Sequence, residues 1–133
     1  RSRGGEVVKN RGLRERTGFA LEGWRSAWRR EHSFRTQAGL AGVALAGLVV
    51  LRPAPVWWAL VAVTCALVLA LELLNSAMEA VIDLLHPGIH PSVKVAKDML
   101  AGAVLMMSFA SLAVAAAMVI DTAPRFLAEI GVL

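Results

Sequence analysis

Three long apolar stretches constrain what this chain can fold into. Uncharged residues run from Ala38 to Leu51, from Val56 to Leu71, and for twenty-two residues from Met99 to Ile120. A helix needs about 20 mostly apolar residues to cross the hydrocarbon core of a bilayer. With 57% hydrophobic residues and a mean hydropathy of +0.61, the chain is more apolar than a soluble domain of 133 residues. We predict an all-α membrane protein with three transmembrane helices.

Turn residues place the ends of these helices. The run Arg52-Pro-Ala-Pro55 breaks the first hydrophobic segment, and a second group of Pro, Gly and His residues lies at 86–91. We expect spans at about 34–51, 56–85 and 97–120. Together with a preceding helix they form one membrane domain, residues 18–121. Residues 122–133 are expected to be a tail or a short interfacial helix.

The positive charge gives the orientation. Ten of the fourteen Lys and Arg residues lie within the first thirty-five positions. Basic segments stay on the cytoplasmic side, which places the N-terminus inside and the C-terminus outside in a multi-pass membrane protein. No nucleic-acid reading module accompanies this basic segment, so anionic lipid headgroups are its expected partners and nucleic acid is not.

The N-terminal region divides into two parts. Residues 1–17 are charged and Gly-rich, and we expect them to be poorly ordered. Over about 18–31, Leu21, Trp24 and Trp28 recur on one side of a helical wheel while the arginines lie elsewhere. That pattern is typical of an amphipathic helix lying in the membrane interface.

The second hydrophobic segment ends in a stripe of polar side chains. At 100° per residue, five of them fall within an arc of about 100° on one helix face: Glu72, Asn75, Ser76, Glu79 and Asp83. Ionisable groups at membrane depth are costly unless they are paired, hydrated or bound to a cation. The stripe is therefore the candidate functional site.

The predicted topology brings other charged residues to the same membrane face. Glu31 falls in the apolar arc if the first helix continues; if the helix ends near Arg30, Glu31 is a solvated surface acid. Lys94, Lys97 and Asp98 share one helix face at the start of the third span. Carboxylates with lysines suit a metal-bridged polyphosphate.

The residues alone leave three interpretations open. The charged groups can bind a metal-bridged polyphosphate, form inter-helix ion pairs, or line an ion or proton path in a small oligomeric channel or transporter. Neither a Walker A loop nor a kinase glycine-rich loop is present in the sequence.

Over residues 18–120 the sequence resembles the prokaryotic diacylglycerol kinases, which include the closely similar undecaprenol kinases. The segment from Glu72 to Asp83 resembles the family signature E-x-x-N-[ST]-A-x-E-x-x-x-D, and Ala96-Lys97-Asp98-Met99 follows at the expected distance. Weaker support comes from Trp28 with Glu31, from Phe34-Arg35 and from His90.

The resemblance implies a homotrimeric lipid kinase of the bacterial inner membrane that transfers the γ-phosphate of MgATP to the hydroxyl of diacylglycerol at the cytoplasmic interface. By the same resemblance Glu72 is the general base and Asn75 orients the γ-phosphate region. Glu31 and Glu79 hold the Mg²⁺ that accompanies ATP, and either the same or a neighbouring subunit supplies Glu31. The residues expected to bind nucleotide are Asp83, His90, Lys97 and Asp98. Those expected at the lipid interface are Trp28, Phe34, Arg35 and Ser76.

The sequence departs from the diacylglycerol kinase pattern at two positions. Gln37 stands where a second acid often follows Phe-Arg, and Gly12 stands where an arginine is expected. The run from Leu100 to Leu105 leans toward the undecaprenol kinases. Undecaprenol is therefore the alternative acceptor.

Overall fold

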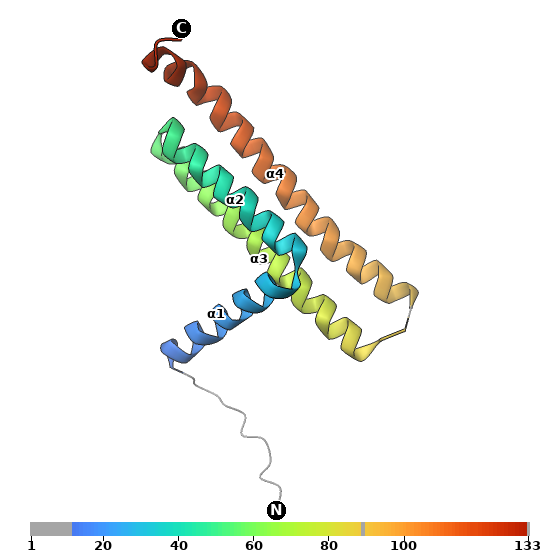
Figure 1. Ribbon diagram of the computed structural model, residues 1–133. Helices are drawn as coiled ribbons and strands as arrows, with labels where there is room; N and C mark the ends of the chain where they lie inside the picture. The colour runs from blue at the N-terminus through green and yellow to red at the C-terminus, as the bar shows by residue number, and fades with distance from the viewer. Residues whose placement is uncertain (1–11, 89, 133) are drawn as a thin grey trace, which may run out of the picture.

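A computed structural model describes residues 12–88 and 90–132, and every secondary-structure element in this part of the chain is an α-helix. It contains α1 (Leu13–Arg30), α2 (His32–Leu51), α3 (Pro55–Leu85) and α4 (Pro91–Glu129). In Figure 1, α2, α3 and α4 run alongside one another, and α1 projects from the bundle where α2 begins. The all-α prediction is confirmed, and α2, α3 and α4 are each long and apolar enough to cross a membrane.

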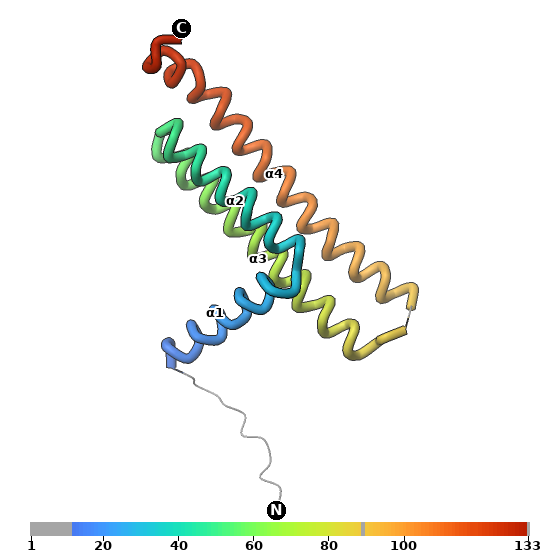
Figure 2. Tube along the Cα trace, in the orientation of Figure 1, coloured from blue at the N-terminus to red at the C-terminus, as the bar shows by residue number. Residues whose placement is uncertain are grey.

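The helix α3 is the centre of the bundle. It contacts α2 and α4 much more extensively than those two helices contact each other. Its 31 residues extend beyond the first turn of α2, so the last turns of α3 and the first turns of α4 project together past the α1–α2 junction (Figure 2). This end of the molecule carries most of the polar residues singled out in the sequence.

Proline and histidine residues set the helix boundaries. Arg52 ends α2 in the left-handed region at φ 47°, and the prolines on either side of Ala54 leave only 52–54 between α2 and α3. A residue before proline is disfavoured in the α region, which explains the abrupt stop. His90 caps α4 because its Nδ1 accepts the N–H of Ser92 at 3.2 Å.

Two helices are longer than the sequence indicated. Leu13 to Thr17 belong to α1, which begins with the Gly12 carbonyl accepting the backbone N–H of Arg16 at 3.2 Å. The Thr17 hydroxyl also donates back to the carbonyls of Leu13 and Arg14. The first eleven residues of the expected disordered segment lie outside the described part of the chain. At the other end, residues 122–129 do not form a separate tail but continue α4 through Pro124. Proline removes one backbone donor, yet the indole of Trp57 donates to Asp121 at 2.9 Å and Thr122 is buried, which holds this end of α4 on α3.

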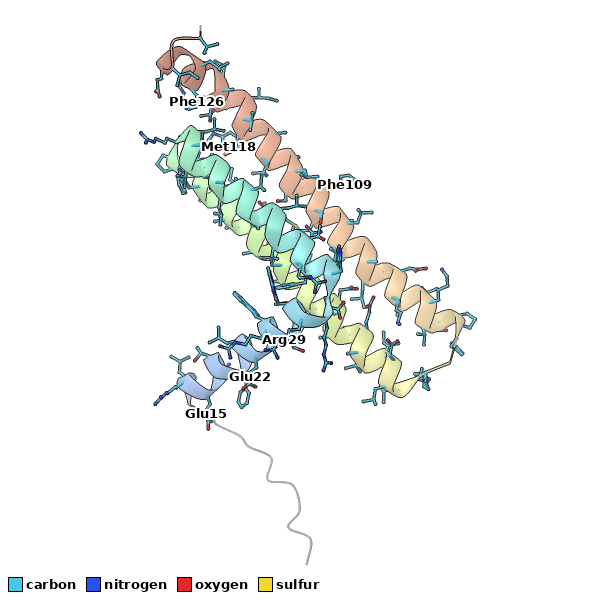
Figure 3. The ribbon with its side chains drawn as sticks, in the orientation of Figure 1. Glu15, Glu22, Arg29, Phe109, Met118 and Phe126 are labelled. Carbon is cyan, nitrogen blue, oxygen red and sulfur yellow. The ribbon has the colours of Figure 1, made fainter. Side chains whose placement is uncertain are left out.

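The tightest packing lies far from the polar end. Leu48, Val61 and Met118, one from each long helix, form a buried cluster. Figure 3 labels Met118, which lies on α4 toward the C-terminal end of the bundle. Elsewhere these helices are poorly covered by the chain itself, and Phe109 on α4 is 64% exposed. Apolar surfaces of this extent are covered by lipid or by other subunits in a membrane protein.

We expect Leu48→Ala to destabilise the fold by about 2–5 kcal/mol, because it leaves a cavity where the three long helices meet. Val49→Ala is the matched control, since Val49 is 62% exposed on the same helix. Unfolding in mixed micelles titrated with a denaturing detergent measures both. Equal losses for the two variants would show that the cluster is not the packing centre.

Candidate functional site

The polar stripe on α3 runs from the interior of the bundle to its rim. Glu72 is only 3% exposed, Asn75, Ser76 and Glu79 are half-buried, and Asp83 is exposed. Eleven residues separate Glu72 from Asp83, which is about 16 Å along a helix. The stripe therefore offers a desolvated carboxylate at one end and a hydrated carboxylate at the other.

Glu72 is held by a residue that the sequence did not single out. The hydroxyl of Ser33, in the first turn of α2, donates a hydrogen bond to Oε1 of Glu72. One turn further along α3, Ser76 donates to the backbone carbonyl of Glu72 at 3.0 Å. No local pattern predicts the Ser33 contact, because it joins residues thirty-nine positions apart and depends on how α2 packs against α3.

Asn75 carries an unsatisfied polar atom. Its Oδ1 is buried and has no hydrogen-bond partner among residues 12–88 and 90–132. Buried polar groups are nearly always paired, because desolvating one without a partner costs about 1–3 kcal/mol. An unpaired oxygen one turn from a buried carboxylate is suited to a hydroxyl or ammonium donor, or to a cation.

A groove of about 500 Å³ lies between α1 and α3. Small residues form much of its walls, with Gly23 and Ala27 on α1 and Ala77 on α3. Glu31 and Ser76 also line it, as do Trp24 and Arg30. The groove is mainly apolar with a few polar groups in its lining, which suits an amphipathic molecule.

Glu31 lies at the junction of α1 and α2. The first helix ends at Arg30, which was one of the two alternatives that the sequence left open. The same alternative made Glu31 a solvated surface acid, but Glu31 is half-buried and lines the groove. Its backbone is extended, at φ −106° and ψ 112°, which turns the chain from α1 into α2. This turn places a carboxylate beside the face of α3 that carries the stripe.

A second, smaller cavity of about 290 Å³ lies at the rim, where α3 turns into α4. Two ion pairs border it: Lys97 Nζ lies 2.5 Å from Asp83 Oδ1, and Lys94 Nζ lies 2.6 Å from Asp98 Oδ2. His90 also lines this cavity. All four residues expected to bind nucleotide are thus brought together here, and Lys94 and His86 join them.

The residues expected at the lipid interface are more scattered. Trp28 is 52% exposed on α1, and its backbone carbonyl accepts a hydrogen bond from the Arg35 guanidinium at 2.9 Å. Arg35 therefore links the start of α2 to the end of α1 by a hydrogen bond. Phe34 is only 6% exposed, so its ring packs inside the chain and is not available at the surface.

The expected metal ligands do not form a ready-made metal centre. Among residues 12–88 and 90–132, no three His, Cys, Asp or Glu side chains converge on one point. Glu31 and Glu79 are oxygen donors of the kind that Mg²⁺ prefers. A cation held by so few protein ligands has to bring further oxygens with it, as Mg²⁺ does when it is bound to phosphates.

Comparisons with known proteins agree with this arrangement. A sequence model of the family described as prokaryotic diacylglycerol kinase matches residues 18–119. A diacylglycerol kinase from Synechocystis is 39% identical over 99 residues, which cover 72% of this chain and 55% of that protein. A diacylglycerol kinase from Pseudomonas aeruginosa is 40% identical over 83 residues, covering 62% of this chain and 68% of that protein.

A diacylglycerol kinase from Helicobacter pylori strain J99 is 32% identical over 88 residues, which cover 66% of this chain and 69% of that protein. The family match includes the whole stripe on α3, the α1–α2 junction and the ion pairs at the rim. The chain belongs to the prokaryotic diacylglycerol kinase family.

Proposed function

We propose that this protein is a lipid kinase that transfers the γ-phosphate of MgATP to the hydroxyl of diacylglycerol, giving phosphatidic acid at the cytoplasmic face of the membrane. One observation carries the proposal beyond family membership. A buried carboxylate, Glu72, lies on the same helix as residues of both an apolar groove and a charged rim. A lipid and a nucleotide need these two different environments.

The proposed reaction needs one proton acceptor and much positioning. Glu72 takes the proton of the lipid hydroxyl, the lipid oxygen forms a bond to the γ-phosphorus, and the bond from that phosphorus to ADP breaks. Phosphoryl transfer depends mainly on alignment and charge neutralisation. A general base contributes about 10²–10⁴ in rate, and a buried carboxylate close to an apolar groove is well placed to act as one.

The groove between α1 and α3 suits the lipid. Its small residues leave room for acyl chains, and Trp24 and Trp28, both more than half exposed, suit a helix at headgroup depth. On this proposal α1 lies in the membrane interface. Ser76 lies where the groove meets the stripe.

The rim suits the nucleotide. Lys97 and Lys94 already face carboxylates across hydrogen-bond distances, and phosphate oxygens can replace those carboxylates as partners of the ammonium groups. Mg²⁺ neutralises charge on the phosphates, and Glu31 and Glu79 would be its protein ligands. The separation of about 16 Å between Glu72 and Asp83 along α3 suits an extended nucleotide better than a compact ligand.

We further propose that the working unit is a homotrimer with shared sites. The unpaired Oδ1 of Asn75, the small number of carboxylates near Glu79 and the exposed apolar faces all fit a site completed by a neighbouring copy. Undecaprenol remains the alternative acceptor, because residues 100–105 resemble the undecaprenol kinases. The alternative of another class is a small oligomeric ion or proton channel or transporter, which would give flux in liposomes without ATP.

The first test offers diacylglycerol and undecaprenol in parallel mixed micelles with radiolabelled ATP. We expect labelled phosphatidic acid, and Glu72→Gln should reduce its rate at least about a hundredfold with assembly intact. Glu22→Gln, an exposed acid on α1, is the control and should keep the wild-type rate. Labelling of undecaprenol alone would change the acceptor, and a normal rate in the Glu72 variant would remove the base assignment.

The metal assignment predicts a different response from Glu79→Gln. The Mg²⁺ concentration that gives half the maximal rate should rise severalfold, because one anionic oxygen ligand is lost, while the KM for the lipid changes little. Titrating MgCl₂ at saturating ATP measures this. An unchanged Mg²⁺ requirement would exclude Glu79 as a ligand.

The unpaired oxygen of Asn75 predicts that function and stability separate. Replacing an unsatisfied buried polar group with an apolar side chain of similar size is nearly neutral or stabilising. Asn75→Leu should therefore unfold at the wild-type temperature or above, while turnover falls about tenfold or more. A loss of more than about 1 kcal/mol in unfolding free energy would instead indicate a structural partner for Asn75.

A further inference from the structure

The contact between Ser33 and Glu72 is the least expected feature of the site. Glu72 is 3% exposed, and its Oε1 accepts the hydroxyl proton of Ser33 from another helix. A buried carboxylate is costly unless its oxygens accept hydrogen bonds. The hydroxyl therefore compensates one oxygen of the residue that we assign as the base.

Ser33 lies in the first turn of α2, close to the α1–α2 junction. Glu31 occupies the N-cap position of α2 without a side-chain hydrogen bond to the helix, and Ser33 follows two residues later in the first turn. The serine thus contributes its hydroxyl to Glu72 of α3. One turn further on, the Thr36 hydroxyl donates to the backbone carbonyl of His32 at 3.1 Å, so it stays within its own helix.

The same contact brings the start of α2 against Glu72. The first N–H groups of a helix have no partners within it, and the positive end of the helix dipole lies there. A carboxylate at this position interacts favourably with that end of the helix. The hydroxyl gives the interaction a direction, because it engages one defined oxygen.

We propose that Ser33 is a positioning residue for phosphoryl transfer, an inference that rests on the proposed function. Its hydroxyl fixes Oε1 of Glu72 and thereby sets the plane of the carboxylate, so that Oε2 receives the proton of the lipid hydroxyl. Ser33 keeps its own proton throughout and does not touch the reacting atoms. Because Glu31 lies two residues earlier, the α1–α2 junction orients both the base and one metal-directed carboxylate.

The test compares Ser33→Ala, Ser33→Thr and Thr36→Ala by product formation from radiolabelled ATP and diacylglycerol. We expect Ser33→Ala to lower kcat about tenfold while the KM values for both substrates stay within about twofold. Ser33→Thr keeps a hydroxyl and should recover at least half of the wild-type kcat. Thr36→Ala is the matched control on the same helix and should behave as wild type.

A double variant distinguishes positioning from a structural role. If Ser33 acts through Glu72, adding Ser33→Ala to Glu72→Gln should lower the residual rate no further, since contacting residues in one mechanism are not additive. An additional tenfold loss in the double variant, or a normal kcat in Ser33→Ala, would overturn the proposal. If Ser33→Ala does not assemble, Ser33→Cys takes its place, because a thiol is a weak donor of similar size, and the same outcomes decide.

The same assay separates the two levels of inference. If Glu72→Gln is inactive and Ser33→Ala is normal, the base assignment stands and the positioning role fails. If Glu72→Gln itself keeps the wild-type rate, the proposed function of Glu72 fails and the role of Ser33 fails with it.

Discussion

The burial of one carboxylate against the start of another helix is the constraint on which the rest of the structure depends. Glu72 is nearly inaccessible, and a hydroxyl from α2 is directed at it. Ser33 can reach Glu72 only if α2 begins beside Glu72. Since α1 ends where α2 begins, α1 then lies beside α3, and the groove forms between these two helices.

The two ends of the molecule are stabilised in different ways. The far end has the apolar cluster of Leu48, Val61 and Met118, together with the hydrogen bond from Trp57 to Asp121. The polar end has ion pairs, a cap and a groove, and much of its surface is exposed. The buried apolar cluster thus lies at one end of the bundle and the candidate site at the other.

Much of the fold follows from the sequence, because periodicity and turn residues act locally. The length of the apolar stretches gave three long helices, and the prolines at 53 and 55 gave the short connection between α2 and α3. Local signals failed at the ends of α1 and α4. There α1 begins five residues earlier than its apolar pattern indicates, and α4 continues past Pro124, close to the buried Thr122.

The site was predictable only where its residues share one helix. The stripe on α3 could be placed because its spacing is helical, and the family signature covers it. The partner of Glu72 could not be placed, because Ser33 approaches from a different helix and nothing near it in the sequence marks the contact. Phe34, which the resemblance placed at the lipid interface, is buried within the fold, and its sequence neighbours did not indicate this.

Glu31 is the single extended residue between α1 and α2, so α1 can tilt about its own C-terminal end. Its eighteen residues span about 27 Å, so a tilt of roughly 10° moves the far end by about 5 Å. Glu31, at the pivot, barely moves. If α1 lies in the membrane interface, undulations of the bilayer surface that tilt it would move the groove wall at Ala20 and Gly23, while the carboxylate of Glu31 would keep its place beside α3.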